Sequence, residues 1–153
     1  MKIRIAGIVE ESVVDGPGLR MTVFTQGCSR NCPGCHNPHT HDPTAGEWAD
    51  TGELLAHFKA HPLLCGLTIS GGEPLLQAAA AATLARGVKA LGKNVLLYSG
   101  YTLEELQVIA KDDEAVAQLL ANLDILIDGP YLEEERDISL AFRGSRNQRL
   151  IYF

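Results

Sequence analysis

Three of the four cysteines in the chain, Cys28, Cys32 and Cys35, lie within eight residues at the spacing Cys-x3-Cys-x2-Cys. Thiolates are preferred ligands of soft metals, and short intervening loops allow three of them to converge on one site. Three ligands are one fewer than a closed tetrahedral zinc site or a fully ligated four-iron cluster requires. Because structural sites tend to be closed and reactive ones to stay open, this loop predicts a metal centre that performs chemistry.

The cysteine loop has two interpretations. In the first, the three cysteines bind three irons of a [4Fe–4S] cluster and leave the fourth iron without a protein ligand. In the second, the loop is a structural zinc site that takes its fourth ligand from a nearby histidine, namely His36, His39 or His41. Structural zinc sites usually draw their ligands from two separate places in the chain, which favours the cluster. The remaining cysteine, Cys65, is expected to be a small buried core residue and not a ligand.

A second polar segment, Ser70-Gly71-Gly72-Glu73-Pro74, follows a short apolar run. One interpretation is a tight turn between a strand and a helix. In the other, the glycines allow a ligand to approach the backbone, the start of the helix favours a carboxylate, and Glu73 accepts hydrogen bonds from an ammonium group. That second arrangement would suit the zwitterionic end of an amino acid.

The elements that must position these segments alternate between strand and helix. Strands are expected at residues 21–25, 67–69, 95–98 and 123–127, and helices at residues 51–61, 74–91, 103–109 and 114–120. A short strand at residues 3–8 is expected at an edge of the sheet, and residues 150–153 form a final apolar run. Such alternation predicts an α/β fold with parallel strands and right-handed crossovers.

The length of 153 residues predicts a single domain, residues 1–153, and is too short for a complete eight-fold barrel. A partial barrel or an open twisted sheet is therefore expected. In both, ligands bind at the carboxyl ends of the parallel strands. The polar segments after the four strands, at residues 28–35, 70–73, 99–101 and 128–129, are predicted to share that rim.

Composition excludes several classes of function. The net charge of −6 argues against general binding of nucleic acid or of an anionic membrane by the whole surface. No apolar run reaches membrane-spanning length, and the first six residues alternate like a strand, unlike a secretory signal. Clustered cysteines in a chain of this length do not suit a disulfide framework. A reducing, cytoplasmic location is expected.

The order of these segments resembles the radical S-adenosylmethionine enzymes, in which Cys-x3-Cys-x2-Cys is followed by a Gly-Gly-Glu loop. The segments Val14-Asp15-Gly16-Pro17-Gly18-Leu19-Arg20, Gln26-Gly27-Cys28 and Cys35-His36-Asn37 are similar to those of activating enzymes for glycyl-radical proteins. Asp128-Gly129-Pro130-Tyr131 and Arg143-Gly144-Ser145-x-Asn147-Gln148 resemble the family that activates anaerobic ribonucleoside-triphosphate reductase. The similarity covers nearly the whole chain.

This resemblance implies a partial β/α barrel and an oxidoreductase that cleaves S-adenosylmethionine reductively at a [4Fe–4S] cluster. The resulting 5′-deoxyadenosyl radical would take a hydrogen atom from a glycine of the partner. The implied partners are a glycyl-radical protein, in the first place the large subunit of anaerobic ribonucleotide reductase, and a one-electron donor such as flavodoxin. The alternatives are activation of another glycyl-radical enzyme, of the pyruvate formate-lyase type, and a non-catalytic zinc-binding interaction module.

The resemblance also implies roles for individual residues. Cys28, Cys32 and Cys35 would hold the cluster. The methionine end of the cofactor would be held by the loop Ser70, Gly71, Gly72 and Glu73. Many relatives have an aromatic residue where this chain has Gly34, and His36 is expected to take over the contact with adenine.

Other polar residues have two interpretations each. Ser99 and Asp128 would meet the ribose or the methionine end, or else have turn-forming or capping roles. Asp15 and Arg20 would shape the entrance of the site or pair with each other on the surface. A last group is expected either to hold cofactor or partner groups or to form a solvated basic face: Arg143, Ser145, Asn147 and Gln148.

Overall fold

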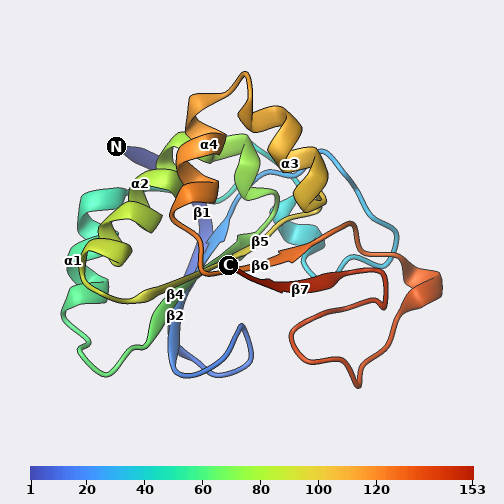
Figure 1. Cartoon of the computed structure of the whole chain (residues 1–153), viewed down its shortest axis with the longest axis horizontal. Helices are drawn as coiled ribbons and strands as arrows, with labels where there is room; N and C mark the ends of the chain where they lie inside the picture. The colour runs from blue at the N-terminus through green and yellow to red at the C-terminus, as the bar shows by residue number, and fades with distance from the viewer.

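The computed structural model describes residues 1–153 and contains one seven-stranded sheet with the strand order β3-β1-β2-β4-β5-β6-β7 (Figure 1). The four central strands are β2 (Arg20–Thr25), β4 (Gly66–Gly71), β5 (Asn94–Tyr98) and β6 (Ile125–Asp128). Neighbouring strands in this group pair in parallel. The predicted α/β fold with a parallel core is therefore confirmed.

The outer strands of the sheet are antiparallel to their neighbours: β1 (Lys2–Ser12), β3 (Glu47–Asp50) and β7 (Arg149–Tyr152). The prediction that the first strand lies at the sheet edge was wrong. The first four residues of β1 pair with β3, a strand that was not expected. As a result, β1 lies between β3 and β2. Only its long-range pairing reveals β3, because the sequence Glu-Trp-Ala-Asp has no strand-like alternation.

The helices lie close to their predicted positions. They are α1 (Thr51–Lys59), α2 (Ala78–Ala90), α3 (Leu103–Ala110) and α4 (Glu114–Ala121), with short 3-10 turns at Pro38–Thr40, Pro74–Gln77 and Glu133–Glu135. The helix expected from Pro74 begins as a 3-10 turn and becomes α-helical at Ala78. Thr102 and Glu105 form a capping box at the start of α3. No helix combines the length and the apolar character needed to cross a membrane.

The two faces of the sheet have different surroundings. The four α-helices gather on one side (Figure 1) and bury side chains such as Leu67, Ile69 and Leu97 in the main core. Side chains alternate along a strand, so Leu96 and Ile127 point to the opposite face and form a small second cluster that contacts Phe142. The opposite face is therefore partly covered by the chain segment between β6 and β7.

Two residues lie where the sequence did not predict them. Arg20 is only 1% exposed and donates to Thr68 Oγ1 at 2.8 Å and to Asn94 Oδ1 at 2.7 Å. Arg20 is therefore a buried connector between strands and not a surface partner of Asp15. Cys65 is exposed, with its thiol 3.4 Å from the carbonyl oxygen of Pro17, so its expected place in the core was wrong.

Candidate functional site

A cavity of about 700 Å³ lies at the carboxyl ends of the parallel strands. This volume is in the range of small-molecule sites, about 300–1,000 Å³. The cavity brings together nine of the residues predicted for the site: Cys28, Cys32, Cys35, His36, Ser70, Gly71, Gly72, Glu73 and Ser99. Asp128 is not among its lining residues. All four predicted segments therefore meet at this rim, the last of them through Gly129.

The cysteine loop is closed at its base by backbone hydrogen bonds. Gly27 N–H donates to Thr40 O at 2.6 Å, and Cys28 N–H donates to His41 O at 3.1 Å. The side-chain amide of Gln26, directly after β2, donates to two further carbonyl oxygens of the returning chain, at 2.9 and 2.8 Å. These contacts fix the two ends of the loop, and the three thiols between them are free and partly exposed.

The spacing of the three thiols bears on the choice between zinc and a cluster. Zn–S bonds of about 2.3 Å in a tetrahedral site place sulfur atoms about 3.8 Å apart. The three sulfurs do not all lie within 4.8 Å of one another, since the one group of three ligand-bearing side chains that does is elsewhere. In this arrangement the three thiols do not form the compact ligand set of a single zinc ion.

Burial raises the pKa of the Cys28 thiol, while the backbone N–H groups of Arg30 and Asn31 partly oppose that change. The loop turns sharply there, with φ of 47° at Asn31, and near its end Asn37 N–H donates to Cys35 Sγ at 3.4 Å. Amide donors directed at a sulfur favour its thiolate form. The loop therefore supplies part of the polarity that an anionic metal–thiolate centre needs.

The pair Gly71 and Gly72 allows two segments of the chain to approach each other. Gly72 N–H donates to Thr25 O at 2.9 Å, and Glu73 N–H donates to Gly27 O at 2.8 Å. Gly71 has φ of 100°, and a Cβ on Gly72 would lie 2.8 Å from the carbonyl carbon of Gly27. The glycines thus hold the end of β4 against the base of the cysteine loop, in addition to lining the cavity.

Glu73 is buried, with 2% of its surface exposed, and its carboxylate accepts three hydrogen bonds from the protein. The donors are Leu75 N at 3.1 Å, Ser99 Oγ at 3.0 Å and Gly100 N at 2.7 Å. Burial raises the pKa of Glu73, and these three donors lower it in part. A carboxylate has about four acceptor sites, so one remains for a group in the cavity.

Ser99 positions Glu73. Its hydroxyl donates to Glu73 and accepts from Tyr101 N–H at 3.0 Å. Of the two interpretations of Ser99, the geometry supports the capping role, since its single hydroxyl proton is already used.

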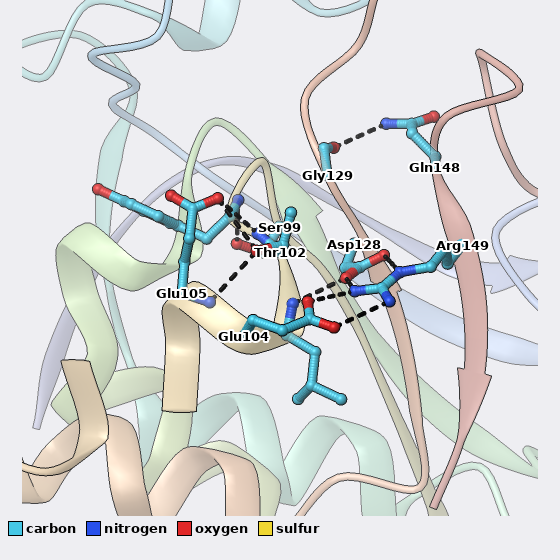
Figure 2. A network of polar contacts seen from close by, with 10 residues as sticks. Ser99, Thr102, Glu104, Glu105, Asp128, Gly129, Gln148 and Arg149 are labelled. Atoms are coloured by element: carbon cyan, nitrogen blue, oxygen red, sulfur yellow. Dashed lines mark hydrogen bonds and ion pairs between the residues drawn. The ribbon is translucent and has the colours of Figure 1, made fainter. Parts of the chain in front are cut away.

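Asp128 belongs to a separate network (Figure 2). Its buried carboxylate accepts from Leu103 N–H at 2.7 Å and from Arg149 Nε at 3.1 Å, and Arg149 also pairs with Glu104. These contacts join the end of β6 to the start of α3 and to β7. Of the two predicted roles of Asp128, the structure supports the capping one.

The segment between β6 and β7 packs over the cysteine loop. The rings of His36 and Tyr131 lie 4.9 Å apart between centroids, and Gly144 leaves room for both. Hydrogen bonds to the backbone of this segment are made by the side chains of Ser145, Asn147 and Gln148. The buried Oδ1 of Asn147 has no partner. Arg143 lines the cavity. His36 is therefore held at the cavity wall by a partner that the sequence did not identify.

Arg30 lines the cavity and was not predicted from the sequence. Its guanidinium lies 4.4 Å from the centroid of the Tyr101 ring, and its buried Nε has no hydrogen-bond partner. The buried Nε2 of His41, which also lines the cavity, is likewise unpaired. Unpaired buried polar atoms beside three free thiols fit a polar cofactor with a thiolate-bound metal cluster. No local signal marks Arg30, because its partners are far away in the sequence.

Comparison with known proteins places this site in context. Residues 14–151 match the family model described as a 4Fe-4S single cluster domain. The anaerobic ribonucleoside-triphosphate reductase-activating protein of Vibrio cholerae is 37% identical over 146 residues, which cover 89% of each chain. The proteins of the same name from Haemophilus influenzae and Enterobacteria phage T4 are 34% and 33% identical, over 89% and 90% of this chain and 89% and 86% of theirs.

One solved structure is similar in fold. QueE from Escherichia coli superposes with a TM-score of 0.53 at 20% sequence identity, over 67% of this chain and 54% of QueE. At that identity the likeness concerns the fold alone.

Proposed function

The chain belongs to the family of anaerobic ribonucleoside-triphosphate reductase-activating proteins, with a 4Fe-4S single cluster domain, and from this premise we propose that it is a radical S-adenosylmethionine activase. The observation that carries the proposal is the meeting of Cys28, Cys32 and Cys35 with the Gly72-Glu73 loop on one cavity. The thiols would hold a [4Fe–4S] cluster with one iron free of protein ligands. When bound, the cluster and S-adenosylmethionine supply the electron and the 5′-deoxyadenosyl radical of the reaction.

The residues of the chain orient and enclose these groups. Glu73, already fixed by Ser99 and Gly100, has one acceptor position left for the ammonium group of the methionine moiety. His36 at the cavity wall would lie against the adenine, supported by Tyr131. Arg30 would donate its unpaired Nε to an acceptor in the cavity. Positioning of this kind can lower a barrier by about 7–11 kcal/mol.

The shape of the fold suits a protein substrate. We propose that the sheet is a partial barrel, since its edge strands β3 and β7 each pair with a single neighbour. An incomplete barrel leaves the cavity accessible to a peptide loop, such as the glycine-bearing loop of a partner protein. The proposed partner is anaerobic ribonucleotide reductase, and the proposed electron donor is a flavodoxin in a reducing cytoplasm.

The test is an electron paramagnetic resonance experiment under anaerobic conditions. The reconstituted protein is incubated with S-adenosylmethionine, reduced flavodoxin and the anaerobic reductase. A glycine-centred doublet on the reductase, absent with Cys32→Ala, is the expected result. A doublet on a pyruvate formate-lyase type partner and none on the reductase would contradict the partner assignment. A colourless protein that binds no iron after reconstitution, holds zinc at the three cysteines and forms no 5′-deoxyadenosine would contradict the activase.

A further inference from the structure

A cluster of metal-ligating side chains lies where β1 meets the end of α1. Glu10 comes from β1, and His57 and His61 come from the last turn of α1 and the residues directly after it. Nε2 of His57 lies 2.9 Å from Oε1 of Glu10, and the two imidazole rings are 5.4 Å apart between centroids. One ligand atom from each of the three side chains lies within 4.8 Å of the other two.

The local backbone explains why the two histidines face the same way. Residues four apart lie on one face of a helix. The helical path continues beyond Lys59, since Ala60 N–H donates to Ala56 O and His61 N–H donates to Phe58 O, both at 3.1 Å. Two histidines at this spacing on a helix form a familiar chelating pair for zinc. The carboxylate of Glu10 comes from β1, so a strand and a helix together supply the three side chains.

The His57–Glu10 pair alone does not account for the arrangement. The contact with Glu10 involves one imidazole, whereas the second imidazole, of His61, lies edge-on to His57. Two imidazoles and a carboxylate are a usual ligand set for zinc, with bonds of about 2.0–2.2 Å. A tetrahedral ion with such bonds would place its ligand atoms about 3.4 Å apart. Partly exposed side chains can reach that spacing by small rotations.

We propose that Glu10, His57 and His61 bind a divalent late first-row transition metal, Zn²⁺ in the first place, with water in the remaining position. This site is distinct from the cysteine cavity. Val9 lines the cavity, and its neighbour Glu10 points to the opposite face of the sheet, toward α1. The bound ion would connect β1 to the end of α1 and so brace the strand that carries one wall of the cavity. The proposal does not depend on the proposed function.

The test uses the full-length chain in which all four cysteines, Cys28, Cys32, Cys35 and the exposed Cys65, are replaced by serine, so that no thiol can compete for the metal. Zn²⁺ binding is measured by calorimetry, and Co²⁺ is used as a spectroscopic probe. We expect one ion per chain, Co²⁺ bands without thiolate charge transfer, and a melting temperature raised by about 5 °C or more at Zn²⁺ 100-fold above its Kd. His61→Gln, His57→Gln and Glu10→Gln should each weaken binding at least about 10-fold.

His39→Gln is the matched control, because His39 is an exposed histidine outside the cluster. It should leave affinity and stoichiometry unchanged. Equal binding by the His61→Gln and parent chains would overturn the proposal, as would binding only at a large molar excess of Zn²⁺. If one cluster variant unfolds, the other two still decide the outcome, since each ligand contributes separately.

Discussion

The backbone N–H of Gly100 donates a 2.7 Å hydrogen bond to the carboxylate of Glu73. These residues follow β4 and β5, so the bond ties the ends of two neighbouring parallel strands together at the cavity. Arg30 of the cysteine loop packs against the same glycine, with Nε 2.6 Å from where a Cβ would stand. The end of β5 therefore holds both the Gly-Gly-Glu loop and the cysteine loop in place.

The titration of Glu73 gives a prediction for stability. Because burial raises its pKa, the folded protein holds the Glu73 proton more tightly than the unfolded chain does. Its contribution to the free energy of unfolding is therefore present at low pH and is lost as pH rises through the window between the unfolded and folded pKa values. Each unit of raised pKa corresponds to about 1.4 kcal/mol.

Glu73→Gln removes this titration. Measured by urea unfolding, the stability of the variant relative to wild type should increase as pH rises above 4.5, the pKa of an unperturbed glutamate. Glu53→Gln makes the same substitution at an exposed carboxylate on α1 and is the control. A relative stability of Glu73→Gln that stays constant with pH would contradict the raised pKa.

Gly72→Ala should loosen the cysteine loop. The new Cβ would press against the carbonyl group of Gly27 and lie 3.0 Å from Thr40 O, where backbone leaves little room to relax. We expect a loss of about 1–3 kcal/mol in unfolding free energy and less iron bound after reconstitution. Gly7→Ala is the matched control, since nothing lies within 4 Å of the position that its new methyl group would occupy. Full iron content in Gly72→Ala would show that iron binding does not require the close approach of Gly72 to Gly27.

Cys32→Ala should abolish formation of 5′-deoxyadenosine, because two thiolates leave the cluster with two unligated irons. Cys65→Ala should keep the iron content and the activity, since that thiol is exposed and remote from the cavity lining. Iron analysis and chromatography of the nucleoside products measure both. Undiminished cleavage by Cys32→Ala would refute its assignment as a ligand.

Arg149→Ala should destabilise the protein because it leaves the buried carboxylate of Asp128 with only Leu103 N–H as partner (Figure 2). Breaking a fully buried ion pair costs about 3–5 kcal/mol. The Arg149 side chain is 46% exposed, so about 2–3 kcal/mol is expected after allowing for solvent screening. Glu104→Ala removes only the exposed partner and should cost much less than Arg149→Ala. Both variants are measured by thermal unfolding. An equal loss of stability in Arg149→Ala and Glu104→Ala would contradict the larger role given to the Arg149–Asp128 contact.

Local chemistry made the central features predictable from the sequence. The β-rich runs ending at Gly27, Gly71 and Gly100 marked where strands end, and parallel strands place those ends on one edge. The three cysteines in one short loop indicated a metal centre without any knowledge of the fold. Glu73 was identified because a carboxylate after two glycines at a strand end can accept hydrogen bonds from an ammonium group.

Contacts between distant segments were decided only by the tertiary structure. β3 exists because β1 offers it a pairing edge, and Cys65 is exposed because its thiol meets the turn at Pro17 instead of the core. Asp128 accepts a hydrogen bond from Arg149, which is 21 residues away in the sequence. Glu10 contacts His57, which is 47 residues away. Residue type and spacing determine which chemistry a short segment can perform. Strand order and register set the distances between segments. They therefore determine which distant side chains contact that short segment.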